Sequence, residues 1–139
     1  MAAALEKCDP AIRITAMPAD ANPAGDIFGG WLMGHMDMAA GIVAARHSRG
    51  RAATIAVEGM TFLLPVHVGD EVSIFADLVK TGRTSMTIAV EAWRRPRTGE
   101  ERQCVTRANF TFVAIDGDRK PRPVPPMDAP LADQENARG

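Results

Sequence analysis

Residues 31–45 read WLMGHMDMAAGIVAA, a run of apolar and small side chains interrupted only by His35 and Asp37. The run is long enough for about four helical turns but too short to span a bilayer, and a helix that is apolar all round is normally buried. Because an unpaired carboxylate is costly to bury, buried acids are usually paired or functional. Asp37 is therefore the first candidate for chemistry, and a structural ion pair or cap is the alternative.

The segments around this run have the periodicity of strands. Alternation over residues 12–17 predicts a short half-buried strand, and the segment 18–30, rich in Pro, Asn, Asp and Gly, predicts a loop. We expect the helix to reach about His47 and to stop at residues 48–50. Further β-rich runs follow, and short turns between the late ones favour antiparallel pairing. These runs are 53–63, which has a bulge or close approach at Gly59, then 71–81, 84–94 and 103–115.

The order of these elements predicts one α+β domain over residues 1–139, in which a curled, antiparallel, five-stranded sheet wraps around one long helix. Its core covers about residues 12–127, and the proline-rich tail is expected to be extended or disordered at its end. One sheet cannot cover the helix on all sides, so the small residues left over require another surface, most simply that of a twofold homodimer. Those residues are Gly34, Ala39, Ala40, Gly41 and Ala44.

The overall charge of the chain gives no sign of a nucleic-acid or membrane partner, because the formal net charge is −1. Charge is unevenly distributed, however: the stretch from Lys80 to Arg122 carries ten basic and five acidic residues, a local excess of +5. Such an excess suits an anionic ligand such as a phosphorylated cofactor. It is equally compatible with solvated strand faces and hairpin tips.

The two cysteines and three histidines show no spacing that is typical of a disulfide framework or a metal site, so we expect no metal. The N-terminal sequence MAAALEKCDP has no apolar core of a signal peptide. These features predict a protein of the reducing cytoplasm.

Two further groups of residues accompany Asp37 as candidates. Gly34, Ala40 and Gly41 share its helix face, and their small size leaves room either for a ligand or for close helix packing. Asp26 precedes the helix, where an acid often serves as a turn or capping residue. Gly29 and Gly30 stand at the helix start, where unpaired N–H groups favour an oxyanion.

Candidate binding residues lie on the strands. Glu58 precedes Gly59 and is either an exposed side chain or an ion-pair partner. Arg83, Thr84 and Ser85 follow a turn, where the guanidinium and the hydroxyls could bind phosphate.

These residues together carry a resemblance. Residues 17–47 (MPADANPAGDIFGGWLMGHMDMAAGIVAARH), VEGMTFLLPVHVGDEV, KTGRTSM and VTRANFTFVAID resemble the hotdog-fold acyl-CoA thioesterases, in particular the YciA and brain acyl-CoA hydrolase family. The resemblance covers about residues 12–127. The chain departs from the family at Arg107, where a small or acidic residue is expected.

The resemblance implies an enzyme that hydrolyses coenzyme A thioesters without a cofactor, coenzyme A being part of the substrate. It implies dimers with a continuous sheet, commonly assembled as trimers of dimers. Asp37 matches the family's catalytic acid, and Asp26 matches a second residue that meets it across the dimer interface.

This reading gives each candidate a role. Gly29 and Gly30 would stabilise the oxyanion, and Asp37 would act as general base or as nucleophile. A non-catalytic acyl-CoA-binding module is the alternative outside enzymes. A hydratase on the same fold would need a positioned histidine, and His35 is two residues from Asp37, so it faces another side of the helix.

Overall fold

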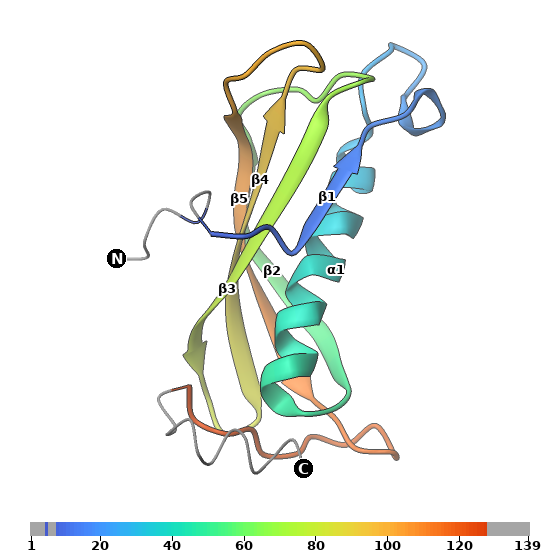
Figure 1. Ribbon diagram of the computed structural model, residues 1–139. Coiled ribbons are helices and arrows are strands. Elements are labelled where there is room, and N and C mark those ends of the chain that lie inside the picture. Colours follow the sequence, from blue (N-terminus) through green and yellow to red (C-terminus); the bar gives the residue numbers. More distant parts are fainter. Residues whose placement is uncertain (1–4, 6–7, 128–139) are drawn as a thin grey trace.

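The computed structural model describes residue 5 and residues 8–127, which form a single curled sheet folded around one long helix (Figure 1). The elements are β1 (Ile12–Thr15), a short 3₁₀ turn (Pro18–Asp20), α1 (Gly29–Ser48), β2 (Ala52–Phe62), β3 (Glu71–Thr81), β4 (Ser85–Arg95) and β5 (Gln103–Ala114). The strands pair antiparallel in the order β1-β3-β4-β5-β2. The predicted fold class is confirmed, and the predicted strand bounds are correct to within two residues.

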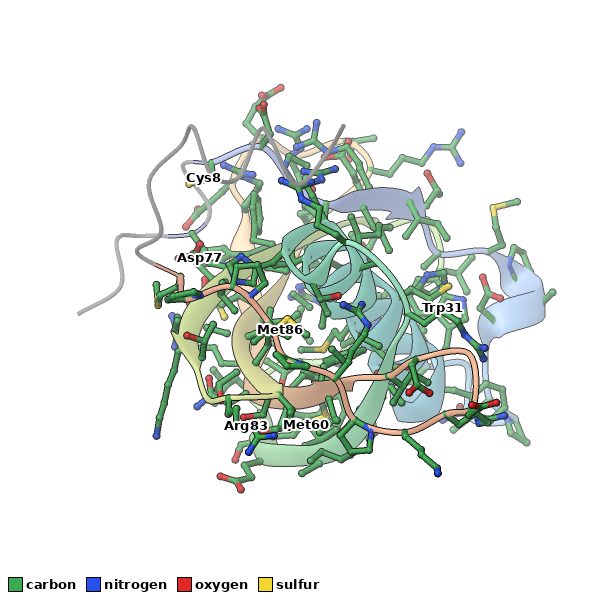
Figure 2. The ribbon with its side chains drawn as sticks, turned by 90° about the horizontal axis from the view of Figure 1, so that it is seen from below. Cys8, Trp31, Met60, Asp77, Arg83 and Met86 are labelled. Carbon is green, nitrogen blue, oxygen red and sulfur yellow. The ribbon has the colours of Figure 1, made fainter. Side chains whose placement is uncertain are left out.

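The core lies between the concave face of the sheet and α1. Alternate residues of β4 and β5 point toward the helix, as the period of two requires; Met86 is one of them and lies between sheet and helix in Figure 2. Leu32, Met36 and Ala40 supply the helix side of this core. The apolar faces of the strands and of the helix therefore pack against each other in one layer.

The helix is buried on one side only in the single chain, as expected of a helix that one sheet cannot cover. Met33, Met38 and Ile42 of α1 are exposed, although they belong to the same apolar run as the buried residues. The sheet is too narrow to wrap the helix completely, as the sequence argument anticipated. A large apolar surface left in water is typical of a contact surface.

Strand β2 forms a second exposed apolar region at one edge of the sheet. Ile55 is 61% exposed, and Val57 and Phe62 are also exposed. Among the described residues β2 pairs on one side only, so its other side has an unpaired row of N–H and C=O groups, which is a template for a further strand. We call these three β2 residues, together with Met33, Met38 and Ile42, the uncovered apolar edge.

Two backbone features position the surrounding loops. Gly59 has φ +74° at an irregularity in the β2–β5 register between Glu58 and Thr61, which confirms the predicted bulge. At the end of the helix, Arg49 rather than Gly50 takes the left-handed conformation, with φ +61°. Gly50 is needed for space instead, because a Cβ there would lie 2.7 Å from Nη2 of Arg122.

The basic stretch from Lys80 to Arg122 does not form a single patch, contrary to its appearance in the sequence. β4 and β5 run antiparallel, so Arg94, Arg95, Arg97 and Arg102 lie at the end of the sheet near the start of α1. Lys80 and Arg83 lie at the opposite end, together with the residues that follow β5 (Figure 1). Arg46, Arg49 and Arg51 join this second end, because it also holds the C-terminus of α1.

Within the described residues, no helix has the length and hydropathy of a membrane span. The same part of the chain contains no group of three or more His, Cys, Asp or Glu side chains arranged to hold a metal ion. The part of the predicted tail beyond residue 127 lies outside the described residues.

Candidate active site

Asp37 is held in place by a neighbour that the sequence did not reveal. The hydroxyl of Thr54, on β2, donates a hydrogen bond of 2.5 Å to Asp37 Oδ1. Asp37 is half-buried in the single chain, so it is neither deeply buried nor unpaired. The deeply buried acid is Asp70, which is 6% exposed and is compensated by the His67 N–H at 2.9 Å and by the Arg94 guanidinium at 3.7 Å.

The space beside Asp37 is smaller than its small neighbours suggested. A Cβ added at Gly34 would meet nothing within 4 Å, so this position opens away from the protein. Gly41 packs instead against the ring of Phe112, and Ala40 is fully buried. Both predicted explanations therefore apply: Gly41 and Ala40 serve helix packing, and only Gly34 leaves room next to Asp37.

The helix start presents unpaired donors. Phe28 is the N-cap and supplies no side-chain cap, and Leu32 N–H is the first to donate within the helix, to Phe28 O at 3.3 Å. The N–H groups of Gly29, Gly30 and Trp31 have no acceptor within the described part of the chain. Such a group of donors at the positive end of a helix dipole favours an anion or a developing oxyanion.

An apolar pocket of about 320 Å³ adjoins these donors. Gly29, Leu32 and Val105 line it, together with residues 27–28 and 62–66. The ring of Phe62 lies so close to Gly29 that an added Cβ would be 3.3 Å from its Cζ atom. Glycine at position 29 therefore leaves room for the Phe62 ring at the pocket.

Asp26 is attached to the loop that precedes β3. It forms an isolated antiparallel bridge with His67, and its Oδ1 lies 3.6 Å from His67 Nδ1. The backbone on its N-terminal side is fixed by Asn22, whose Oδ1 accepts hydrogen bonds from the N–H groups of Ala24 and Asp26. The Asp26 side chain is about half exposed, so the loop presents this carboxylate to solvent.

Within one chain, the structure brings together only part of the predicted catalytic set. Asp26, Gly29 and Gly30 lie at the N-terminal end of α1. Asp37 follows Gly29 by eight residues, a rise of roughly 12 Å along the helix axis. Along the helix axis, Gly29 and Asp37 of one chain are therefore separated by more than the length of a thioester group.

The predicted binding residues lie elsewhere. Arg83, Thr84 and Ser85 are at the β3–β4 turn, at the other end of the sheet from Gly29, and Figure 2 shows Arg83 at the periphery of the view, away from α1. Glu58 and Gly59 border a pocket of about 240 Å³ on the face of the sheet that points away from the helix. Arg107, the departure from the family pattern, pairs there with Glu91 at 3.0 Å.

His35 does not join the acids. Its ring packs edge-on against Trp31, with ring centroids 4.5 Å apart. Its Nδ1 atom is buried and has no hydrogen-bond partner in the part of the chain that the structure describes. His35 thus lies on another side of the helix from Asp37, which agrees with the sequence argument against a histidine-based hydratase.

The chain is similar to known proteins in sequence and in structure. The sequence signature of the thioesterase superfamily matches residues 24–101, which include Asp26, Asp37 and the turn of Arg83. The chain belongs to the thioesterase superfamily. The acyl-CoA thioester hydrolase YciA of Salmonella typhimurium is 50% identical over 117 residues, which make up 82% of this chain and 88% of that protein.

Solved structures of other members of the thioesterase superfamily share the architecture. The hexameric thioesterase of Yersinia pestis superimposes with a TM-score of 0.81 at 49% identity, over 84% of this chain and 95% of that one. The hexameric hotdog fold thioesterase of Campylobacter jejuni gives a TM-score of 0.80 at 34% identity, over 94% of this chain and 96% of that one. The curled sheet around one helix is therefore the hotdog fold that the resemblance predicted.

Three features of the site were missed from the sequence. Thr54 and His67 become partners of the two acids only through strand and loop register. Arg46, Arg49 and Arg51 join the end that holds Arg83 only because α1 and β3 end on the same side. Their residue types gave no signal, since threonine, histidine and arginine are ordinary at such positions.

Proposed function

We propose that this protein is an acyl-CoA thioester hydrolase that acts as a homo-oligomer. The observation that carries the proposal is the Asp37 carboxylate, which Thr54 orients on a helix face that opens at Gly34. The relative from Salmonella typhimurium, which is 50% identical in sequence and is named as an acyl-CoA thioester hydrolase, supports the same chemistry.

The reaction adds water across the thioester C–S bond and gives a carboxylic acid and a free thiol. The thioester carbonyl oxygen accepts hydrogen bonds from the Gly29 and Gly30 N–H groups. These donors stabilise the negative charge that develops on it, and one such donor typically contributes about 10²–10³ in rate. Asp37 takes the proton of the attacking water as general base. Alternatively, it attacks the carbonyl carbon itself, and water then hydrolyses the resulting acyl–Asp37 anhydride and regenerates the carboxylate. The sulfur leaves as thiolate and is protonated.

Because about 12 Å along α1 separates Gly29 from Asp37, we infer that the groups of one site come from two chains. A twofold axis perpendicular to α1 would place the two α1 helices antiparallel, with the helix start of one protomer beside the middle of its partner's helix. One site then contains Gly29, Gly30 and Asp26 of one protomer and the partner's Asp37. In this arrangement Asp26 orients the water or the substrate.

The uncovered apolar edge is the surface through which the two protomers associate. It combines an unpaired strand with exposed apolar side chains of α1 and β2, and pairing β2 with its twofold copy would continue the sheet. The hexameric assembly of the two structural relatives suits a trimer of such dimers.

Arg83, Thr84 and Ser85 bind the nucleotide end of coenzyme A, which carries phosphates. Their end of the sheet also holds Lys80, Arg46 and Arg51, so the local field favours an anion. Glu58 and Gly59 are distant from Asp37 within one chain, and their assignment to substrate binding stays a prediction.

Release of free thiol from acyl-CoA esters of graded chain length tests the function directly. We expect turnover of several of these esters by the purified protein, without added cofactor. Binding of the same esters without any thiol release would favour the non-catalytic acyl-CoA-binding module instead.

A further inference from the structure

Residues 121–127 form a segment without regular secondary structure that crosses the end of the molecule where α1 stops and β3 turns into β4 (Figure 1). We call it the C-terminal strap. It begins where Pro121 forms an isolated bridge with Ile115, just after β5. Its backbone is tied to the sheet by the Arg122 N–H, which donates to Ala114 O at 2.9 Å.

Arg122 anchors the strap to the helix. Its Nη1 donates to Ser48 O at 2.7 Å, so a cation meets the last carbonyls of α1, where the helix dipole is negative. Its other nitrogens donate to Ser48 Oγ, Arg51 O and Ile115 O at 3.1, 3.1 and 2.9 Å. One guanidinium therefore joins the end of α1, the start of β2 and the end of β5.

The next residues of the strap hold the β3–β4 turn. The Val124 N–H donates to Arg83 O at 3.0 Å, and Val124 also packs against the core. On its other side, the turn is held by the Ala114 N–H, which donates to Thr84 O at 2.9 Å. The strap is fixed again at Pro125, whose carbonyl accepts a 2.7 Å hydrogen bond from His47 Nε2.

The Arg83 side chain remains free while its backbone is fixed. It is exposed, and no hydrogen bond or ion pair engages its guanidinium within the described residues. If a binding loop is held in one conformation before the ligand arrives, less conformational entropy is lost on binding. The strap thus holds the backbone of the turn that carries this cation in one conformation.

We propose that the C-terminal strap is a positioning element for the substrate, in which Arg122 fixes the strap and the Val124 N–H fixes the turn that carries Arg83. Arg122 and Val124 do not touch the substrate in this arrangement; they act through Arg83. The proposal rests on the proposed function, in that the nucleotide end of acyl-CoA is the ligand of Arg83.

Val124→Pro is the direct test of the turn contact, because it deletes the N–H that donates to Arg83 O and leaves the guanidinium of Arg122 intact. Residues 123 and 125 are already proline, so the extended strap tolerates a further one. We expect KM for an acyl-CoA ester to rise about tenfold with kcat unchanged. We expect no change for an N-acetylcysteamine thioester of the same acyl group, which lacks the nucleotide.

Arg122→Lys is the companion variant, because it keeps the positive charge but cannot make the four hydrogen bonds. It should raise KM in the same way as Val124→Pro. Lys120→Ala is the matched control: it removes an exposed cation two residues away, on the loop before the strap, and should leave KM within about twofold of the original.

Hydrogen–deuterium exchange of the peptide containing residues 81–85 gives a readout that does not depend on activity. Faster exchange in Val124→Pro than in the unmodified protein is expected, and unchanged exchange would show that the strap does not hold the turn. Faster exchange with an unchanged KM would overturn the link to the substrate. If the unmodified protein hydrolyses no acyl-CoA ester, the proposed function fails, and the exchange still decides whether the strap fixes the turn.

Discussion

Thr54 donates its hydroxyl hydrogen to Asp37 Oδ1 over 2.5 Å, and this contact joins the edge strand β2 to the middle of α1. Both residues border the uncovered apolar edge, at which we place the partner protomer. The hydrogen bond therefore fixes the direction in which the carboxylate faces before a substrate is bound. Preorganisation of this kind is the usual basis of efficient acid–base catalysis.

Asp37→Asn should reduce kcat for acyl-CoA hydrolysis by about 10²-fold or more, because the amide cannot accept the proton of water. The amide still fits the site and can accept the Thr54 hydrogen bond, so the melting temperature should change little. Thr54→Val should lower kcat about tenfold, because the Asp37 carboxylate loses the hydrogen bond that orients it. Asp77→Asn, an exposed carboxylate on β3, serves as control; near-normal turnover of Asp37→Asn in a thiol-release assay would refute the assignment.

The composite site predicts complementation between two inactive variants. Asp26→Ala and Asp37→Ala subunits, mixed in equal amounts and allowed to exchange, should recover about one quarter of the original activity, since half of the dimers are hybrids with one intact site. Exchange is verified by mass spectrometry of differently labelled subunits. Verified hybrids that remain inactive would mean that both acids act within the same chain.

Arg83→Ala should raise KM for acyl-CoA by about tenfold and leave kcat unchanged, because it removes a charge-assisted contact that is equal in ground and transition states. A thioester without the nucleotide should be hydrolysed as before. Lys80→Ala, at the same end of the sheet, is the control for a general loss of positive charge. An equal loss with both substrates would assign Arg83 to the fold or to the chemistry.

Ile55→Lys should dissociate the assembly, because it places a charge in the uncovered apolar edge. Light scattering after size-exclusion chromatography should then show a smaller species, and activity should fall with it if the site is shared. Val79→Lys is matched, since Val79 is an exposed apolar residue on β3 instead of β2. Retention of the full assembly by Ile55→Lys would place the interface elsewhere.

Most of the fold could be predicted from local patterns. The period of two over the four late strands predicts their number and bounds, and the apolar run with its small residues predicts the helix. The end of the helix was predicted at residues 48–50 and is confirmed there: α1 ends at Ser48 and Arg49 takes the left-handed turn, while Gly50 leaves space for the Arg122 side chain. That contact comes from a residue more than seventy positions later in the chain, so no local pattern contains it.

The sequence by itself determined that one apolar helix carries one acid, that another acid precedes it and a glycine pair stands at its start, and that strands follow. These are properties of residue type and spacing, and they do not depend on how the side chains pack. Only the tertiary structure decided what surrounds them: Thr54 reaches Asp37, Gly41 is occupied by Phe112 while Gly34 stays open, and the basic stretch divides between two ends of the sheet. Strand register and chain reversal place residues that are distant in sequence side by side, and neither is encoded in the spacing of neighbours.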